Sequence, residues 1–125
     1  MTASVKRINI ISATLIATLI TCKSGMAGSA NSVYVIQPQV ELGQNLAGGS
    51  GIAFVYISSD TTSTPACSRY ADRLAIDPSS DVGKAMLSVV LTAYSLNKKV
   101  NIAGTGSCNL WSDSETLQWI VIPPQ

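Results

Sequence analysis

One segment with helical periodicity lies among segments that alternate like β-strands, and this arrangement constrains the fold most. Residues 81–97, DVGKAMLSVVLTAYSLN, follow an Asp-Pro pair that cannot continue a strand. The serines and aspartate at positions 79–81 can cap the helix. Apolar positions recur every three or four residues. They predict a core face that consists of Val82, Ala85, Met86, Val89, Val90, Ala93 and Tyr94.

The predicted helix is apolar over a wider arc than one small domain needs. Leu87 and Leu91 extend the core face, and the polar stripe consists only of Lys84, Ser88, Thr92 and Ser95. An apolar surface of this size favours a second body that covers it. We therefore expect a homo-oligomer in which Leu87 and Leu91 contact neighbouring copies. A covering loop of the same chain, or two simply exposed leucines, are the alternatives.

Five segments have strand patterns. Residues 33–42 alternate, with Tyr34, Ile36, Pro38, Val40 and Leu42 on the predicted core face and Pro38 at an edge or a bulge. Residues 51–58 are apolar on both faces, as in a central strand. The other strands are expected at residues 67–77, 100–103 and 116–122. Three strands, a helix and two strands predict a mainly β domain. This is the order of the five-stranded OB-like barrel, although other sheets with one helix across a face share it.

The first thirty residues have the pattern of a secretory signal peptide. Lys6 and Arg7 precede an apolar run at residues 8–20, and small residues then offer cleavage after Ala27 or Ala30. We expect a secreted or periplasmic protein with one domain at residues 31–125. Acylation of Cys22 is an alternative that the preceding threonine disfavours.

The expected domain contains two cysteines, Cys67 and Cys108, which are predicted to form a disulfide across 41 positions. Its five basic and seven acidic residues give a small negative charge without a basic run. This composition argues against nucleic acid as a partner.

No catalytic constellation is apparent. The sequence has no histidine and no G-x-S-x-G motif, and Asp113 and Glu115 lack the spacing of a calcium loop. We therefore expect a protein without catalytic activity, metal or cofactor.

Three short stretches carry a resemblance to a known family. They are ACS at 66–68, LTAYSLNKKVNI at 91–102 and CNLW at 108–111. The chain resembles the subtilase cytotoxin B-subunit-like family, which includes AB5 toxin B subunits and secreted bacterial proteins of unknown role. The resemblance implies an OB-like fold, a disulfide, and a homopentamer whose helices face a central pore, with the polar stripe lining it. It further implies binding of sialylated glycans and a secreted catalytic subunit as partner.

Candidate sugar-binding residues combine aromatic rings with hydrogen-bonding side chains. They are Ser32, Tyr34, Ser68, Arg69, Tyr70 and Trp111. Ser32 and Tyr34 are the residues nearest to the family's glycan-binding serine and tyrosine, and Arg69 can pair with a sialic-acid carboxylate. Structural roles remain open: Tyr34 in the core, Trp111 over the disulfide and Arg69 as a solvated charge. The alternative function is a small secreted structural or protein-interaction domain.

Overall fold

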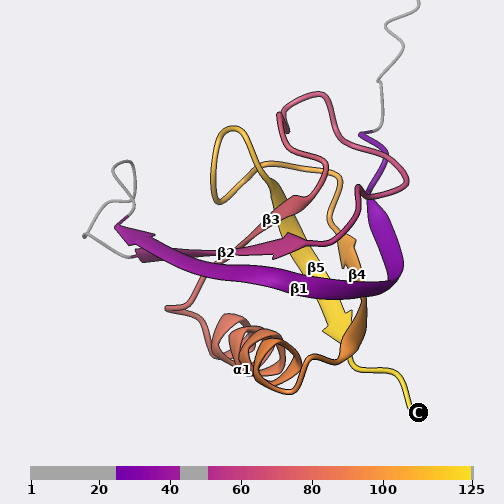
Figure 1. Ribbon diagram of the computed structural model, residues 1–125. Coiled ribbons are helices and arrows are strands. Elements are labelled where there is room, and N and C mark those ends of the chain that lie inside the picture. The colour runs from indigo at the N-terminus through magenta and orange to yellow at the C-terminus, as the bar shows by residue number, and fades with distance from the viewer. Residues whose placement is uncertain (1–24, 43–50, 125) are drawn as a thin grey trace, which may run out of the picture.

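The computed structural model describes residues 25–42 and 51–124, which form a closed β-barrel with one helix (Figure 1). The elements are β1 (Ser29–Leu42), β2 (Gly51–Ile57), β3 (Arg73–Ile76), α1 (Asp81–Ser95), β4 (Lys99–Gly104) and β5 (Glu115–Val121). The strands close in the order β1-β2-β3-β5-β4. The helix lies between the third and fourth strands, which confirms the predicted OB-like arrangement. Residues 1–24 of the predicted leader (residues 1–30), with Cys22, lie outside the described residues.

β1 closes the barrel because it is long enough to pair with two strands. Its first half pairs with β4 and its second half with β2, and the long strand curves between them (Figure 1). Pro38 lies in the half that pairs with β2, and none of the register pairs with β4 includes it, so the predicted edge position is confirmed. All strand pairs are antiparallel except β3 with β5.

The predicted core face of β1 is wrong in its first part, where Val33 and Val35 are buried and Tyr34 and Ile36 are exposed. Farther along, Pro38 and Val40 lie opposite the core residues Val55 and Ala53, on the predicted side, but Val40 is exposed. A register shift between Val35 and Gln37 interrupts the alternation on which the prediction depended. β1 also starts earlier than expected, at Ser29, and Ala30 is buried in the core. The barrel therefore uses residues that precede position 31.

β3 is shorter than predicted. It begins at Arg73, and residues 67–72 form turns instead of extending the ladder. The Ser68 amide donates to the carbonyl of Pro65, and the Arg69 amide donates to that of Asp113, so both are satisfied outside a sheet. The predicted disulfide is present: Cys67 and Cys108 are bonded, with their Cα atoms 6.0 Å apart. It joins the turn before β3 to the loop after β4.

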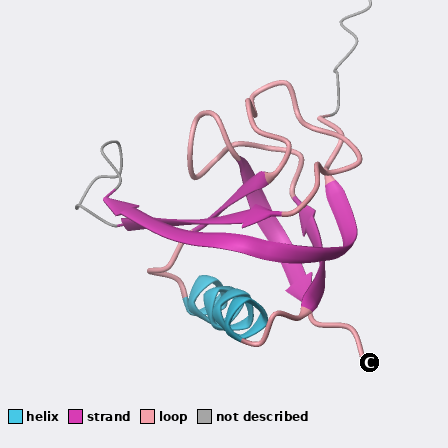
Figure 2. Ribbon diagram, in the orientation of Figure 1, coloured by secondary structure: helices cyan, strands magenta, loops and turns pink. Residues whose placement is uncertain are grey.

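α1 lies beneath the strands and covers one end of the barrel (Figure 2). Ser80 caps its N-terminus, accepting a hydrogen bond from the Gly83 amide at 3.0 Å. The helix ends at Ser95, two residues before the predicted end, and Asn97 follows in the left-handed region with φ 50°.

The buried face of the helix only overlaps the predicted one: Met86, Val90 and Ala93 were predicted correctly, whereas Ala85 is exposed. Gly83, Val90 and Ala93 are buried, and Met86 and Leu87 pack against the core. Val82 is 66% exposed and Tyr94 is 49% exposed, so their predicted core positions are wrong. Gly83 allows this rotation because its missing side chain lets the helix lie against the backbone of Asp77. Leu91 is 46% exposed, and the polar stripe is also exposed, with members Lys84, Ser88, Thr92 and Ser95.

Candidate ligand-binding face

The register of β1, β2 and β3 places a polar row beside an aromatic row on the outside of the barrel. Gln37 lies opposite Tyr56, and Gln39 lies opposite Phe54. Tyr56 in turn lies opposite Arg73. Directly opposed residues project to the same side of a sheet, so these side chains share one surface. We call this surface the Arg73 face; its members are Gln37, Gln39, Glu41, Tyr56, Tyr70 and Arg73.

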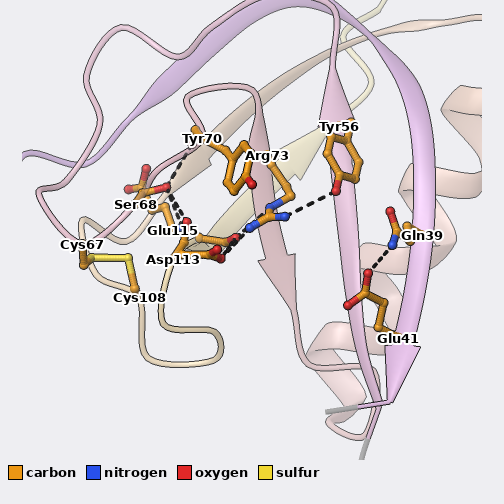
Figure 3. Close-up of polar contacts among 11 residues, drawn as sticks. Gln39, Glu41, Tyr56, Cys67, Ser68, Tyr70, Arg73, Cys108, Asp113 and Glu115 are labelled. Carbon is orange, nitrogen blue, oxygen red and sulfur yellow. Dashed lines mark hydrogen bonds and ion pairs between the residues drawn. A yellow bond between two sulfur atoms is a disulfide. The ribbon is translucent and has the colours of Figure 1, made fainter. Parts of the chain in front are cut away.

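The polar row is ordered by its own hydrogen bonds. The Gln37 amide nitrogen donates to the Gln39 carbonyl oxygen at 3.2 Å. The Gln39 amide nitrogen in turn donates to a carboxylate oxygen of Glu41, as Figure 3 shows. Gln37 and Glu41 are exposed, and Gln39 is half-buried. Each amide has a second N–H and further lone pairs. The row therefore presents oriented donors and acceptors at the surface.

Arg73 organises the aromatic part of the face. The carbon of its guanidinium lies 3.9 Å from the ring centre of Tyr70, 4.8 Å from that of Phe54 and 5.9 Å from that of Tyr56. Its Nη1 donates to the Tyr56 hydroxyl at 3.5 Å (Figure 3). These contacts hold a planar cation against the rings, an arrangement that lysine cannot reproduce.

The charge of Arg73 is balanced by the loop that follows β4. Nη2 donates to Oδ1 of Asp113 at 2.5 Å, and Nε donates to the Ser114 hydroxyl at 2.7 Å. The Arg73 side chain is 11% exposed and that of Asp113 is 32% exposed. Partial burial strengthens this ion pair relative to one in water. The guanidinium is thus a neutralised support for the rings.

Trp111 covers the base of the same face. Its ring meets Phe54 edge to face, with ring centres 5.3 Å apart, and Leu110 packs beside it. Phe54, Ile52 and Ala75 form a buried cluster separate from the barrel core. The predicted sugar-contacting tryptophan is therefore half-buried as a lid over this second cluster.

Four of the six predicted sugar-binding residues gather at this end of the molecule: Ser68, Arg69, Tyr70 and Trp111. The Ser68 hydroxyl donates to the carbonyl of Tyr70 at 2.9 Å and also lies 3.4 Å from that of Asp113. It therefore positions the turn that carries Tyr70. Arg69 is exposed beside it.

Ser32 and Tyr34 lie elsewhere, at the junction of β1 with β4. The Ser32 amide donates to Oδ1 of Asn101 at 2.9 Å, and Ser32 has φ 56° within a register shift. Lys99 Nζ lies 5.5 Å from the ring centre of Tyr34. The predicted set is therefore divided between two places. Sequence reasoning missed Arg73 and Tyr56, because only the strand register brings them beside the glutamines.

The described residues contain no group of three or more side chains suited to hold a metal ion. Asp113 is in the ion pair with Arg73, and the Glu115 carboxylate accepts hydrogen bonds from backbone amides. The pKa of Asp77 is lowered by hydrogen bonds from the hydroxyl and amide of Ser79, before α1.

No helix within residues 25–42 and 51–124 is long and apolar enough to cross a membrane. No family model, curated protein or solved structure matches this chain. The functional argument therefore depends on the side chains of the Arg73 face.

Proposed function

We propose that the protein is a secreted, non-catalytic glycan-binding domain and that the Arg73 face is its binding surface. The observation that carries the proposal is the row of ordered glutamine amides beside Tyr56, next to the Arg73 guanidinium that contacts both Tyr56 and Tyr70. A sugar ring offers an apolar face for an aromatic side chain and hydroxyls for amide groups. The second and third strands of OB-folds are a common surface for oligosaccharides. The hydrogen bonds already hold the glutamine side chains in place, and such preorganisation reduces the entropy lost on binding.

The charge of the face favours a neutral sugar. Asp113 already neutralises Arg73, and the remaining charge of the face is that of Glu41. A sialic-acid carboxylate would need to compete with Asp113 for the guanidinium, or to bind the exposed Arg69. Sugar hydroxyls need only donors and acceptors, which the glutamines supply. Neutral terminal sugars are therefore our first candidates and sialylated glycans the second.

The test is a glycan array with the oxidised, exported chain, followed by calorimetry on the glycans that bind. Gln39→Ala and Tyr70→Ala should each weaken binding. One lost hydrogen bond of about 1 kcal/mol corresponds to roughly fivefold in affinity. Gln118→Ala, an exposed site on β5, is the matched control and should bind normally. Selective binding of sialylated glycans that Arg69→Ala abolishes and Gln39→Ala leaves intact would contradict the neutral-sugar proposal. No binding across a broad array would contradict glycan binding itself.

A second candidate function is that of an interaction domain that associates with copies of itself. The largest oligomer we propose is a homopentamer. Its support is the exposed apolar surface of α1 and its C-cap, which includes Val82, Leu91, Tyr94 and Leu96. Leu87 was expected to be part of this exposed surface, but it packs against the barrel core. Light scattering coupled to gel filtration gives the mass in solution. An oligomer that Leu91→Asp dissociates supports self-association, and a monomer at micromolar concentration contradicts it.

A secreted catalytic subunit as partner would be recovered by affinity capture from the natural culture medium.

A further inference from the structure

Glu115, at the start of β5, is a carboxylate buried almost completely inside the fold. It is 2% exposed. Its Oε1 accepts hydrogen bonds from the Gly28 amide at 3.0 Å and from the Gly106 amide at 2.7 Å, and its Oε2 lies 3.3 Å from the Gly28 nitrogen. Within residues 25–42 and 51–124, the ion pairs are Arg73 with Asp113 and Lys84 with Asp81, and neither includes Glu115. A buried carboxylate is costly without a cation, so the position of the Gly28 nitrogen is significant.

Gly28 is held in this position by its lack of a side chain. A Cβ at this residue would lie 2.7 Å from Oγ1 of Thr61 and 2.8 Å from Oε2 of Glu115, and it would also collide with the carbonyl oxygen of Ser63. These distances are shorter than a Cβ atom can approach another heavy atom. Because glycine has no Cβ, both carboxylate oxygens of Glu115 can lie close to the nitrogen of residue 28.

The sequence offers two cleavage positions for the expected leader, after Ala27 and after Ala30, each with a small residue two positions earlier. The pairing of β1 with β4 favours one of these two cleavage positions. Ser29 pairs with Ala103 and Ala30 with Ile102 in the ladder that closes β1 on β4, and Ala30 is buried. Cleavage after Ala30 removes this part of the strand. Cleavage after Ala27 leaves β1 complete and makes the nitrogen of Gly28 the new N-terminus.

We propose that a leader peptidase cleaves the Ala27–Gly28 bond and that the new terminal ammonium forms a buried ion pair with Glu115. Water adds across the amide bond: Ala27 keeps the oxygen as its carboxylate, and Gly28 becomes an amine that takes up a proton at neutral pH. The backbone N–H of the uncut chain is thereby replaced by a cation at the same place. Processing then stabilises the folded barrel. The inference rests on the proposed export of the chain and is independent of the glycan site.

The first test is the N-terminus of the protein itself. The full chain of 125 residues is expressed in a bacterial host with a general secretory pathway, and the exported product is examined by intact mass and N-terminal sequencing. The expected product begins at Gly28. A product that begins at Asn31, one lipidated at Cys22 or an uncut chain would overturn the proposal, whatever the glycan array shows.

The second test measures the ion pair. A second chain is fused to a leader that is cleaved directly before Ala27. This matched chain begins at Ala27, so the nitrogen of Gly28 remains a peptide amide. The chain that begins at Gly28 should melt several degrees higher at pH 7. Glu115→Gln should remove most of this difference, whereas Glu41→Gln, the same change at an exposed carboxylate, should preserve it. Equal melting temperatures of the two chains would overturn the ion pair.

A pH series keeps this test decisive even if Glu115→Gln does not fold. A terminal amine has an ordinary pKa near 8, and pairing with a carboxylate raises it. The amine is charged below that pKa and neutral above it. The difference in melting temperature should therefore be complete at neutral pH and disappear in alkaline solution. A difference that persists unchanged at alkaline pH would overturn the proposal.

Discussion

Replacing Gly83 by alanine should destabilise this protein, although the same change stabilises most helices. Gly83 is the third residue of α1, and its amide donates to the capping Ser80 hydroxyl. A Cβ at this residue would lie 2.7 Å from the carbonyl carbon of Asp77 and 2.8 Å from Oγ of Ser80, and it would collide with the Asp77 carbonyl oxygen. Backbone atoms cannot rotate away as a side chain can. The helix must therefore move off the barrel or lose its cap.

The magnitude follows from three opposing contributions. Alanine gains about 1 kcal/mol over glycine from helix propensity. Overpacking costs about 1 to 3 kcal/mol, and a lost N-cap costs about 1 kcal/mol more. The net result is a loss of about 2 kcal/mol, which for a domain of this size lowers the melting temperature by roughly 8 to 16 °C.

Thermal and urea unfolding monitored by circular dichroism provide the assay. Ser95→Ala, at an exposed position in the last turn of α1, is the control and should be neutral or slightly stabilising, because alanine has the higher helix propensity. A Gly83→Ala variant that is as stable as the parent, or more stable, would refute the close packing of α1 against Asp77.

Three further predictions concern the disulfide, Asp77 in the turn before α1 and the Arg73 face. Replacing Cys67 and Cys108 by serine should lower the free energy of unfolding by about 4 kcal/mol on the chain-entropy model, measured by urea denaturation; no change would contradict a constraining role. Asp77→Asn should be less stable than the parent at pH 7, and the gap should close as the pH falls below 3.8, because the lowered pKa of Asp77 contributes stability only while the carboxylate is charged. A gap independent of pH between 2 and 7 on such a scan would show that the Ser79 contacts are not responsible. Arg73→Lys should lose about 1 to 2 kcal/mol of stability and most glycan binding, since lysine cannot hold Asp113 and the rings together; unchanged calorimetry would contradict this.

The order of the elements could be predicted because its signals are local. The Asp-Pro pair and the serine cap define the start of the helix, and both lie within a few residues of the structure they determine. The disulfide followed from the number of cysteines left in the expected domain. β2 was predictable because its residues are apolar on both faces and it lies between the barrel core and the cluster under Trp111.

The errors have nonlocal causes. The register shift after Val35 exchanges the two faces of β1, and only the pairing with β2 reveals it. The buried face of α1 depends on the fit of Gly83 to the backbone of Asp77, which a hydrophobic pattern does not encode. Residues 67–72 alternate like a strand, yet the Arg69 amide donates to the carbonyl of Asp113 and the Ser68 amide to that of Pro65, so neither joins the ladder.

The candidate site was predictable only in part. Ser68, Arg69 and Tyr70 were identified as binding types, although on an expected strand and not in a turn, and the glutamines of β1 were expected to face solvent. That these residues share one surface was not predicted, because the surface is created by the strand registers that place Gln37 beside Tyr56 and Tyr56 beside Arg73. Arg73 itself occupies an apolar strand that gives no sign of its aromatic neighbours.

The central claim is that the β1–β2–β3 surface around Arg73 binds sugars, and an NMR titration tests it most directly. The ¹⁵N-labelled exported chain is titrated with the neutral oligosaccharide that gives the strongest array signal. We predict that the shifted amides fall at Gln37, Gln39, Tyr56, Tyr70 and Arg73, with α1 unaffected. Shifts centred on Ser32 and Tyr34 at the β1–β4 junction, or no saturable shifts at millimolar sugar, would contradict it.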